Sequence, residues 1–269
     1  MTLHLRAVER QNWPERLDGQ FPFIVPVIKA LHTLTFSAPV TFLVGENGAG
    51  KSTLMEALAC AVLLPTIGSE PVNRDPALAP QRELSHYFRL VWNKRTRRGF
   101  FLRAEDFFGY ARRMAQIKAE MQRDMAAVDE EYGGRSALAR DLAKMPYARE
   151  LGDMQNRYGE GLDNQSHGES FLLLFRERFV PDGLYLLDEP EAPLSPVRQL
   201  GLLALLKQMV EEGGQFIIAT HSPILMAFPG AEILTLDGNG VHSVAYNDLE
   251  HVKLTRDFLN HPEAFLRHL

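Results

Sequence analysis

The sequence lacks several features that would place it in a specialised class. Its single cysteine, Cys60, excludes a disulfide within the chain and a cysteine zinc cluster. No apolar run is long enough to span a membrane, since the run from Ala57 to Leu64 has the length of a buried helix. The first residues carry charges and lack the apolar segment of a secretory signal. These absences predict a cytoplasmic protein without membrane insertion, in which Cys60 is a core residue.

Basic charge is also scarce. The net charge of −5 and the pI near 6.0 argue against a generally basic nucleic-acid-binding protein. The stretch from Asn93 to Arg103 is a local exception, because basic residues lie there beside aromatic ones. Two interpretations stay open: a solvated hairpin turn between two strands, or a contact with the phosphates of DNA.

The hydrophobic pattern alternates between short apolar runs and helical segments, which predicts an α/β fold. We expect a mainly parallel central sheet flanked by helices, with an antiparallel β portion. Residues 106–165 are rich in Ala, Met, Arg and Glu at helical spacing and predict a helical insertion broken near Pro146. The core of the fold would then consist of residues 1–105 and 166–269.

The clearest motif begins at Gly45, where GENGAGKS matches G-x-x-x-x-G-K-[ST] between a buried strand and a helix. Its glycines permit positive φ, so that successive backbone N–H groups can surround phosphate at a helix N-terminus. The lysine supplies a cation for the β and γ phosphates, and Ser52 supplies a hydroxyl for Mg²⁺. We therefore assign nucleotide binding to Gly45, Glu46, Asn47, Gly48, Ala49, Gly50, Lys51, Ser52 and Thr53.

Three further residues follow buried strands. Asp188 and Glu189 come after the apolar run LYLL, where Asp188 can hold Mg²⁺ and Glu189 can polarise a water for attack on the γ-phosphate. His221 ends the next strand and can donate to that phosphate. The carboxyl ends of parallel strands lie at the same edge of the sheet. The sequence thus predicts a nucleotide-hydrolysing site with Lys51, Glu189 and His221 as catalytic residues.

The motifs GENGAGKST, SHGES, LLDEPEAPLS and ATHSP, in this order, resemble the ATP-binding cassette (ABC) ATPases. The chain is most similar to the soluble SMC-like and RecF-like members, which are labelled AAA-type. The resemblance covers residues 40–52 and 166–269 well and the middle third poorly. It implies that the first motif is the Walker A loop, that Asp188 and Glu189 form Walker B, and that His221 is the switch histidine.

The resemblance also implies a head-to-tail homodimer formed around ATP. Glu191 to Ser195 would be the D-loop crossing the interface, and the segment beginning at Ser166 would be the signature, acting on the partner's nucleotide. Its match to L-S-G-G-Q is partial. The signature residues are Ser166, His167, Gly168, Glu169 and Ser170.

Two family positions stay open. The Q-loop glutamine is not evident, and the candidates are Gln81, in a proline-rich segment expected to be a loop, and Arg103 or Glu105. The aromatic residue that stacks on adenine is also undetermined, with Trp13 and Phe23 as candidates.

Three functions follow from these residues. We expect an Mg²⁺-dependent ATPase that drives a partner protein, such as a nuclease or effector in DNA repair or phage defence, or acts on DNA. The first alternative is the nucleotide-binding subunit of an ABC membrane transporter. The second is a nucleotide switch without hydrolysis, which Glu189 and His221 disfavour.

Overall fold

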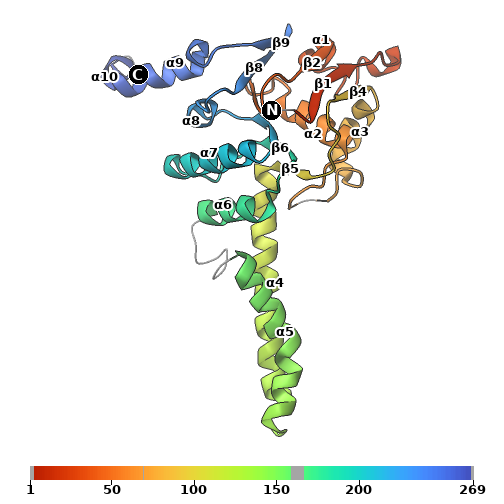
Figure 1. Cartoon of the computed structure of the whole chain (residues 1–269), viewed down its shortest axis with the longest axis vertical. Coiled ribbons are helices and arrows are strands. Elements are labelled where there is room, and N and C mark those ends of the chain that lie inside the picture. The colour runs from red at the N-terminus through yellow and green to blue at the C-terminus, as the bar shows by residue number, and fades with distance from the viewer. Residues whose placement is uncertain (1–2, 69, 159–166, 268–269) are drawn as a thin grey trace.

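The computed structural model describes residues 3–68, 70–158 and 167–267 (Figure 1). Within these ranges, it does not describe the side chains of residues 107, 108, 110–115, 150, 153–158 and 167–170.

A six-stranded sheet forms the centre of the molecule. Neighbouring strands are parallel except for the last, which closes an antiparallel hairpin. Strands 40–44, 184–188 and 215–219 are buried at every position, as expected for parallel strands covered on both faces. In spatial order the strands are β5 (Gly99–Arg103), β6 (Leu184–Asp188), β7 (Gln215–Ala219), β3 (Val40–Val44), β8 (Glu232–Asp237) and β9 (Gly240–Ser243).

A smaller antiparallel sheet lies against this core. Its order is β2 (Thr33–Thr35), β1 (Leu5–Arg10) and β4 (Phe88–Trp92). The buried Gln215 joins the two sheets, because its amide oxygen accepts from the backbone N–H groups of His4 and Leu5 and its nitrogen donates to the Leu5 carbonyl. The fold class expected from the sequence is confirmed, including its antiparallel portion.

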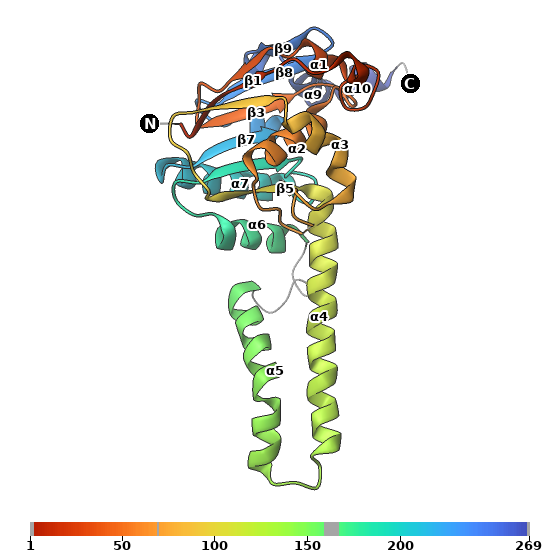
Figure 2. The same ribbon diagram turned by 90° about the vertical axis from the view of Figure 1, so that its right-hand side faces the viewer.

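Helices cover both faces of the large sheet (Figure 2). The helix that follows β3 packs with the small sheet in one apolar core, and the helices between residues 167 and 260 pack in the other. The second core contains a connected series of six aromatic rings: Phe100, Phe171, Phe175, Phe179, Tyr185 and Phe216. The helices are α1 (Pro26–Ala30), α2 (Lys51–Val62), α3 (Ala79–Ser85), α4 (Ala104–Glu131), α5 (Ala137–Tyr158), α6 (His167–Arg178), α7 (Pro196–Glu211), α8 (Pro223–Met226), α9 (Glu250–Asn260) and α10 (Pro262–Leu266). Three short 3₁₀ helices are η1 (Glu15–Leu17), η2 (Pro76–Leu78) and η3 (Tyr246–Asp248).

Helices α4 and α5 form an antiparallel hairpin that projects from the core (Figures 1 and 2). Asp129 of α4 pairs with Lys144 and Arg140 of α5. The insertion is helical, as expected, but α5 continues through Pro146, so the expected break there is wrong. A helix tolerates an interior proline when the lost hydrogen bond lies on an exposed face, since water can satisfy the freed carbonyl.

Two other local expectations are also wrong. Strands β4 and β5 belong to different sheets, so the basic segment between them is not a hairpin turn. Gln81 lies on helix α3 rather than in a loop. No helix in the described part of the chain combines the length and apolar character needed to cross a membrane.

Candidate functional site

The loop from Gly45 to Gly50 joins β3 to α2 in a conformation that depends on glycine. Gly48 has φ of +82° and Gly50 has φ of +96°. A Cβ at Gly50 would come within 2.7 and 2.8 Å of methyl groups on Val25 and Val27. Glycine at this position therefore allows both the turn and its close packing. Helix α2 begins at Lys51 directly after the turn, so the loop presents a helix N-terminus.

The Lys51 side chain folds back over this loop. Its Nζ donates to the carbonyls of Gly45 at 2.9 Å and Glu46 at 3.1 Å. Burial lowers the pKa of its ammonium, while nearby carboxylates, Glu189 first among them, oppose this shift. The cation is thus held beside the cradle that the loop forms.

Asp188 and Ser52 meet behind the loop. Asp188 ends β6, is only 6% exposed and accepts a hydrogen bond from Ser52. Burial raises the pKa of Asp188 to about 7; the Ser52 hydrogen bond opposes the shift, and the charges of Glu189 and Glu56 add to it. Its Oδ1 is buried without a partner. A buried carboxylate oxygen left unsatisfied beside a serine hydroxyl fits Mg²⁺, which takes few protein ligands and completes its shell with phosphate and water.

Glu189 follows in an unusual backbone conformation. Its φ of +51° is left-handed, which a glutamate seldom adopts. Its N–H donates to the Ala219 carbonyl at 2.9 Å, which ties the residue to the adjacent strand β7. Its carboxylate is 48% exposed, and Oε1 lies 3.8 Å from Nε2 of His221. The strained turn directs the carboxylate away from buried Asp188 and toward the histidine.

Glu191 holds the loop that carries His221. Its Oε1 accepts from the Thr220 hydroxyl and from the His221 backbone N–H, both at 2.7 Å. Ser222 caps α8 and bonds Gln199 of α7. The sequence places Glu191 in the D-loop but does not indicate this contact, because the two segments are thirty residues apart.

A cavity of about 520 Å³ opens beside these groups. Its lining residues are Phe21, Val25, Asn47, Gly48, Gly50, Lys51, Ser52, Thr53 and Glu189. The aromatic residue here is Phe21, which is 53% exposed. The expected aromatic residues, Trp13 and Phe23, do not line it: Phe23 is buried in the core, and Trp13 packs against it and against Tyr87. In this segment the sequence does not distinguish an exposed phenylalanine from a buried one two positions away.

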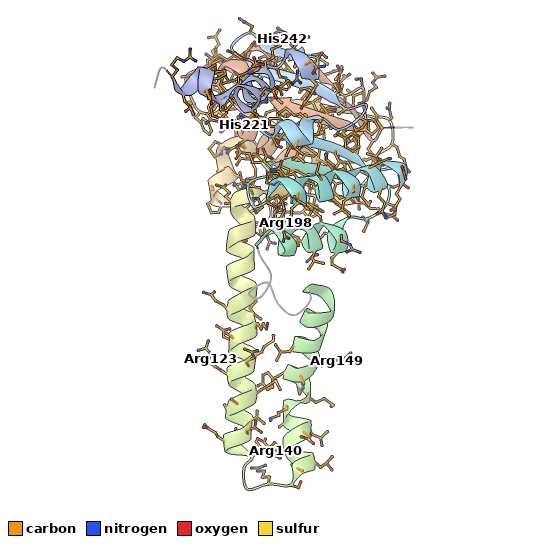
Figure 3. The ribbon with its side chains drawn as sticks, turned by 90° about the vertical axis from the view of Figure 1, so that its left-hand side faces the viewer. Arg123, Arg140, Arg149, Arg198, His221 and His242 are labelled. Atoms are coloured by element: carbon orange, nitrogen blue, oxygen red, sulfur yellow. The ribbon has the colours of Figure 1, made fainter. Side chains whose placement is uncertain are left out.

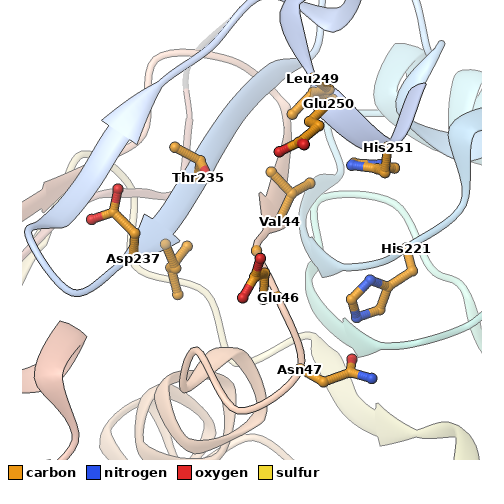
Figure 4. Close-up of a pocket in the computed structure, with 11 residues that line it drawn as sticks. Val44, Glu46, Asn47, His221, Thr235, Asp237, Leu249, Glu250 and His251 are labelled. Carbon is orange, nitrogen blue, oxygen red and sulfur yellow. The ribbon is translucent and has the colours of Figure 1, made fainter. Parts of the chain in front are cut away.

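A second cavity, of about 650 Å³, opens beside the same loop (Figure 4). Glu46, His221 and the first turn of α9 line it, including Glu250 and His251. Burial lowers the pKa of His251, and the charges of His221 and Lys51 lower it further. This cavity therefore lies between the first turn of α9 and the phosphate loop. Figure 3 shows His221 in the body of the protein, above the helical hairpin that carries Arg123, Arg140 and Arg149.

The remaining Q-loop candidates lie close together. Arg103 ends β5 directly beside Asp188 of β6. Gln81 is buried and donates to the Glu56 carboxylate at 2.8 Å. Arg103 pairs with the same carboxylate at 3.1 Å, whereas Glu105 is exposed. The structure thus brings Arg103, and not a glutamine, to the end of the strand beside Asp188.

The signature segment is only partly described. Ser166 lies outside the described residues, and His167 to Ser170 form the first turn of α6 with side chains that are not described. The role of Ser166 to Ser170 as a signature that acts on the partner's nucleotide therefore stays a prediction.

The basic segment contacts the body of the protein. Lys94 pairs with Asp182 at 2.8 Å, Thr96 Oγ1 donates to the Asp182 carbonyl, and Arg98 donates to the Pro181 carbonyl. Three side chains of the basic segment, Lys94, Thr96 and Arg98, thus have partners within the chain.

Comparison with known proteins gives matches along most of the chain. A family model described as "AAA domain" matches residues 23–153, and one described as "AAA domain, putative AbiEii toxin, Type IV TA system" matches residues 170–227. The cobalt import ATP-binding protein CbiO of Salmonella typhimurium is 27% identical over 247 residues, covering 87% of this chain and 83% of that protein. The macrolide export ATP-binding/permease protein MacB of Photorhabdus laumondii is 26% identical over 243 residues, covering 88% of this chain and 33% of that one.

Two solved structures are also similar. The ADP conformation of MJ1267, an ATP-binding cassette of an ABC transporter, has a TM-score of 0.49 at 14% identity and covers 95% of this chain and 99% of that one. The Smc head domain of Pyrococcus furiosus, bound to the C-terminal domain of ScpA, has a TM-score of 0.46 at 12% identity, with coverage of 95% and 99%.

Proposed function

Because this chain is an ABC-type P-loop ATPase, we propose that it hydrolyses Mg²⁺-ATP at the Gly45–Thr53 loop within a head-to-tail homodimer. One observation carries the assignment of the site. The glycine loop with Lys51, the Ser52–Asp188 pair, and the Glu189–His221 pair all lie at the carboxyl ends of β3, β6 and β7.

Each residue then has a role in phosphoryl transfer. Backbone N–H groups of the loop and Lys51 bind the β and γ phosphates. Ser52 and Asp188 hold Mg²⁺, which neutralises phosphate charge when it is bound. Glu189 accepts a proton from the attacking water as the water approaches phosphorus. His221 donates to the γ-phosphate and stays oriented through Glu191.

The exposure of the catalytic pair supports the dimer. Glu189 is 48% exposed and His221 is 40% exposed, so the position of the γ-phosphate is open to solvent in one copy. A closed site excludes water and strengthens each electrostatic contact inside it. The Ser166–Ser170 segment of a second copy would cover this opening and supply hydroxyl and backbone N–H groups to the phosphate.

A mixing experiment tests this arrangement. Lys51→Ala removes the phosphate cation, and Gly168→Asp places a negative charge in the signature; we expect each variant alone to be inactive. In a mixed head-to-tail dimer, one of the two sites combines an intact loop with an intact signature. We therefore expect mixing to restore phosphate release, and its continued absence in a confirmed mixed dimer would contradict composite sites.

The biological process is the finer part of the proposal. We propose that the dimer drives a partner effector in defence. The description of the family model on residues 170–227 names a toxin of a type IV toxin–antitoxin system, which supports defence over repair.

The curated relatives support a second function, the ATP-binding subunit of a membrane transporter. CbiO is named for cobalt import and MacB for macrolide export. Copurification of the native protein with a multi-span membrane protein would favour this function. Recovery with a protein that has no membrane span would favour the first.

Loss of the Glu191 contact should impair catalysis more than binding. Glu191→Ala frees the backbone at His221, and small misplacement of catalytic groups can cost up to about 100-fold in rate. We expect kcat to fall about 10-fold or more with KM changed less than about threefold. Glu191→Gln retains one acceptor oxygen and should recover part of the loss. Glu212→Gln, at an exposed site on the same chain, is the control; equal effects of Glu191→Ala and Glu191→Gln would contradict the contact's role.

Phe21 is the proposed contact for the adenine base. Stacking of a base on an aromatic ring contributes about 1–3 kcal/mol, so Phe21→Ala should raise the Kd for ATP by about 5- to 150-fold. Phe21→Trp should preserve binding. Ile24→Ala removes an equally exposed apolar side chain that does not line the cavity. Calorimetric titration that gives the same Kd for both alanine variants would remove Phe21 from the site.

Magnesium binding should weaken as pH falls. The pKa of Asp188 is raised to about 7, so below that pH the carboxyl holds a proton that Mg²⁺ must displace. We expect the free Mg²⁺ concentration for half-maximal ATP affinity to rise about 5-fold from pH 7 to pH 6, after correction for ATP protonation. Asp188→Asn should bind Mg²⁺ weakly with no such pH dependence. A pH-independent Mg²⁺ requirement in the native protein would contradict this prediction.

A further inference from the structure

A group of charged side chains, here called the Arg103 cluster, lies beside the proposed metal site. It consists of Arg103, Glu56, Asp75, Gln81 and Asp106. The Arg103 guanidinium pairs with Glu56 at 3.1 Å and Asp75 at 3.5 Å, and it contacts both carboxylate oxygens of Asp106 at 2.7 and 3.0 Å. Gln81 donates to the second oxygen of Glu56 at 2.8 Å. One guanidinium thus joins three buried carboxylates, and the exposed carboxylate of Glu105 also lies 3.6 Å from it.

The cluster is buried and its charges do not balance. The Arg103 side chain is 11% exposed, and the carboxylates of Glu56, Asp75 and Asp106 are each 12% exposed. A buried carboxylate is costly unless it is paired. The other nearby arginine, Arg82, donates to the backbone carbonyls of Val72 and Asp75. Removing the Arg103 charge would therefore leave the carboxylates of Glu56, Asp75 and Asp106 without a cationic partner among the ion pairs of the described residues.

Helix geometry places this charge next to the proposed metal site. Glu56 lies one turn after Ser52 on α2, so the two side chains share a face of that helix. Arg103 lies beside Asp188 in the register of β5 and β6. Asp106 lies in the first turn of α4, so the same guanidinium also fixes the start of the hairpin.

We propose that Arg103 is a positioning residue for the ATPase reaction. Its guanidinium neutralises Glu56 and fixes α2 against β5, the strand that pairs with β6, so that Ser52 and Asp188 keep the separation and local charge that Mg²⁺-ATP requires. It acts through Glu56 and does not touch the nucleotide. This inference depends on the proposed Mg²⁺-ATP site and is independent of the dimer.

The test is a charge-rescue experiment on nucleotide binding. Residues that support metal ligands typically change metal affinity about 10- to 100-fold when replaced. We expect Arg103→Met to weaken ATP binding in Mg²⁺ by about that factor, and binding in EDTA by less than about threefold. In Arg103→Met/Glu56→Gln the uncompensated carboxylate on the helix that carries Ser52 is gone, although Asp75 and Asp106 remain, so Mg²⁺-ATP affinity should recover to within about fivefold of the native value. Calorimetry gives both affinities without relying on turnover.

Two controls separate this role from a merely structural one. Arg89→Met breaks an exposed pair with Glu9 and should change neither affinity. Circular dichroism checks the fold; if Arg103→Met does not fold, Arg103→Gln, which also removes the charge, is compared with Arg103→Gln/Glu56→Gln. Native affinity in Arg103→Met, equal losses with and without Mg²⁺, or absence of rescue by Glu56→Gln in either background would overturn the proposal. Absence of Mg²⁺-ATP binding by the native protein would instead contradict the proposed function.

Discussion

Glu189→Gln is expected to lower kcat for ATP hydrolysis by about 10²- to 10⁴-fold while the Kd for ATP stays within a few-fold of the native value, as is typical when a general base is removed. Glutamine keeps the shape and can still adopt the turn at φ of +51°, but its amide cannot accept the proton of the attacking water. Among the described residues, Glu189 bonds the Ala219 carbonyl and lies near His221, and no hydrogen bond joins it to the phosphate loop. Binding of ATP should therefore persist.

Phosphate release under single-turnover conditions, together with titration of a fluorescent ATP analogue, measures both quantities. Glu211→Gln neutralises an exposed carboxylate at the end of α7 and is the control. Retention of more than about a tenth of the native kcat would assign the base to another group, since such catalysis contributes at least about 100-fold.

Gly50→Ala should abolish nucleotide binding at practical concentrations and also destabilise the fold. An L-residue in the left-handed region costs about 1–2 kcal/mol, and the new methyl would lie within 2.8 Å of both Val25 and Val27. Relief of that overlap requires the loop to move, and its N–H groups would no longer converge on phosphate. We expect the Kd for ATP to rise at least about 100-fold, because a displacement near 1 Å can cost that factor.

Gly48→Ala is the matched control for stability. Gly48 also has positive φ, +82°, but its Cβ would meet no atom within 4 Å. Its Tm should therefore fall less than that of Gly50→Ala, and Val25→Ala should recover part of the Gly50→Ala loss. Equal Tm changes in Gly48→Ala and Gly50→Ala would show that packing against Val25 and Val27 is unimportant.

Local sequence determines the parts of the molecule that were predicted correctly. The buried strands of the parallel sheet appear as short apolar runs, and the phosphate loop appears as glycines at fixed spacing between such a strand and a helix. The carboxyl ends of β6 and β7 follow from the same pattern. Fold class and the approximate site could therefore be predicted without long-range information.

Long-range contacts explain the errors. Strands β4 and β5 are adjacent in sequence, yet they pair with β1 and β6, which no local pattern indicates. Phe21 and Phe23 are the same residue type two positions apart, and only tertiary packing buries one and exposes the other. The contacts of Glu191 with Thr220, and of Arg103 with Glu56, each bring together two distant segments. Such roles become visible only when the segments are placed in space.

The positive φ of Glu189 is another feature that sequence did not indicate. The preceding strand ends at Asp188, and the chain must turn at once while Glu189 keeps its N–H bonded to β7. Backbone strain of this kind persists where the surrounding structure fixes it, commonly at functional sites. It is consistent with the proposed role of Glu189 as the proton acceptor.

Sedimentation velocity of Glu189→Gln tests the central claim most directly, because this variant should bind Mg²⁺-ATP without hydrolysing it. We expect this variant to be a dimer with Mg²⁺-ATP and a monomer with Mg²⁺-ADP or without nucleotide. Of these conditions, only ATP supplies the γ-phosphate that both subunits are proposed to contact. Gly168→Asp in the same background should remain monomeric. A Glu189→Gln protein that is saturated with Mg²⁺-ATP and sediments only as a monomer would contradict the account.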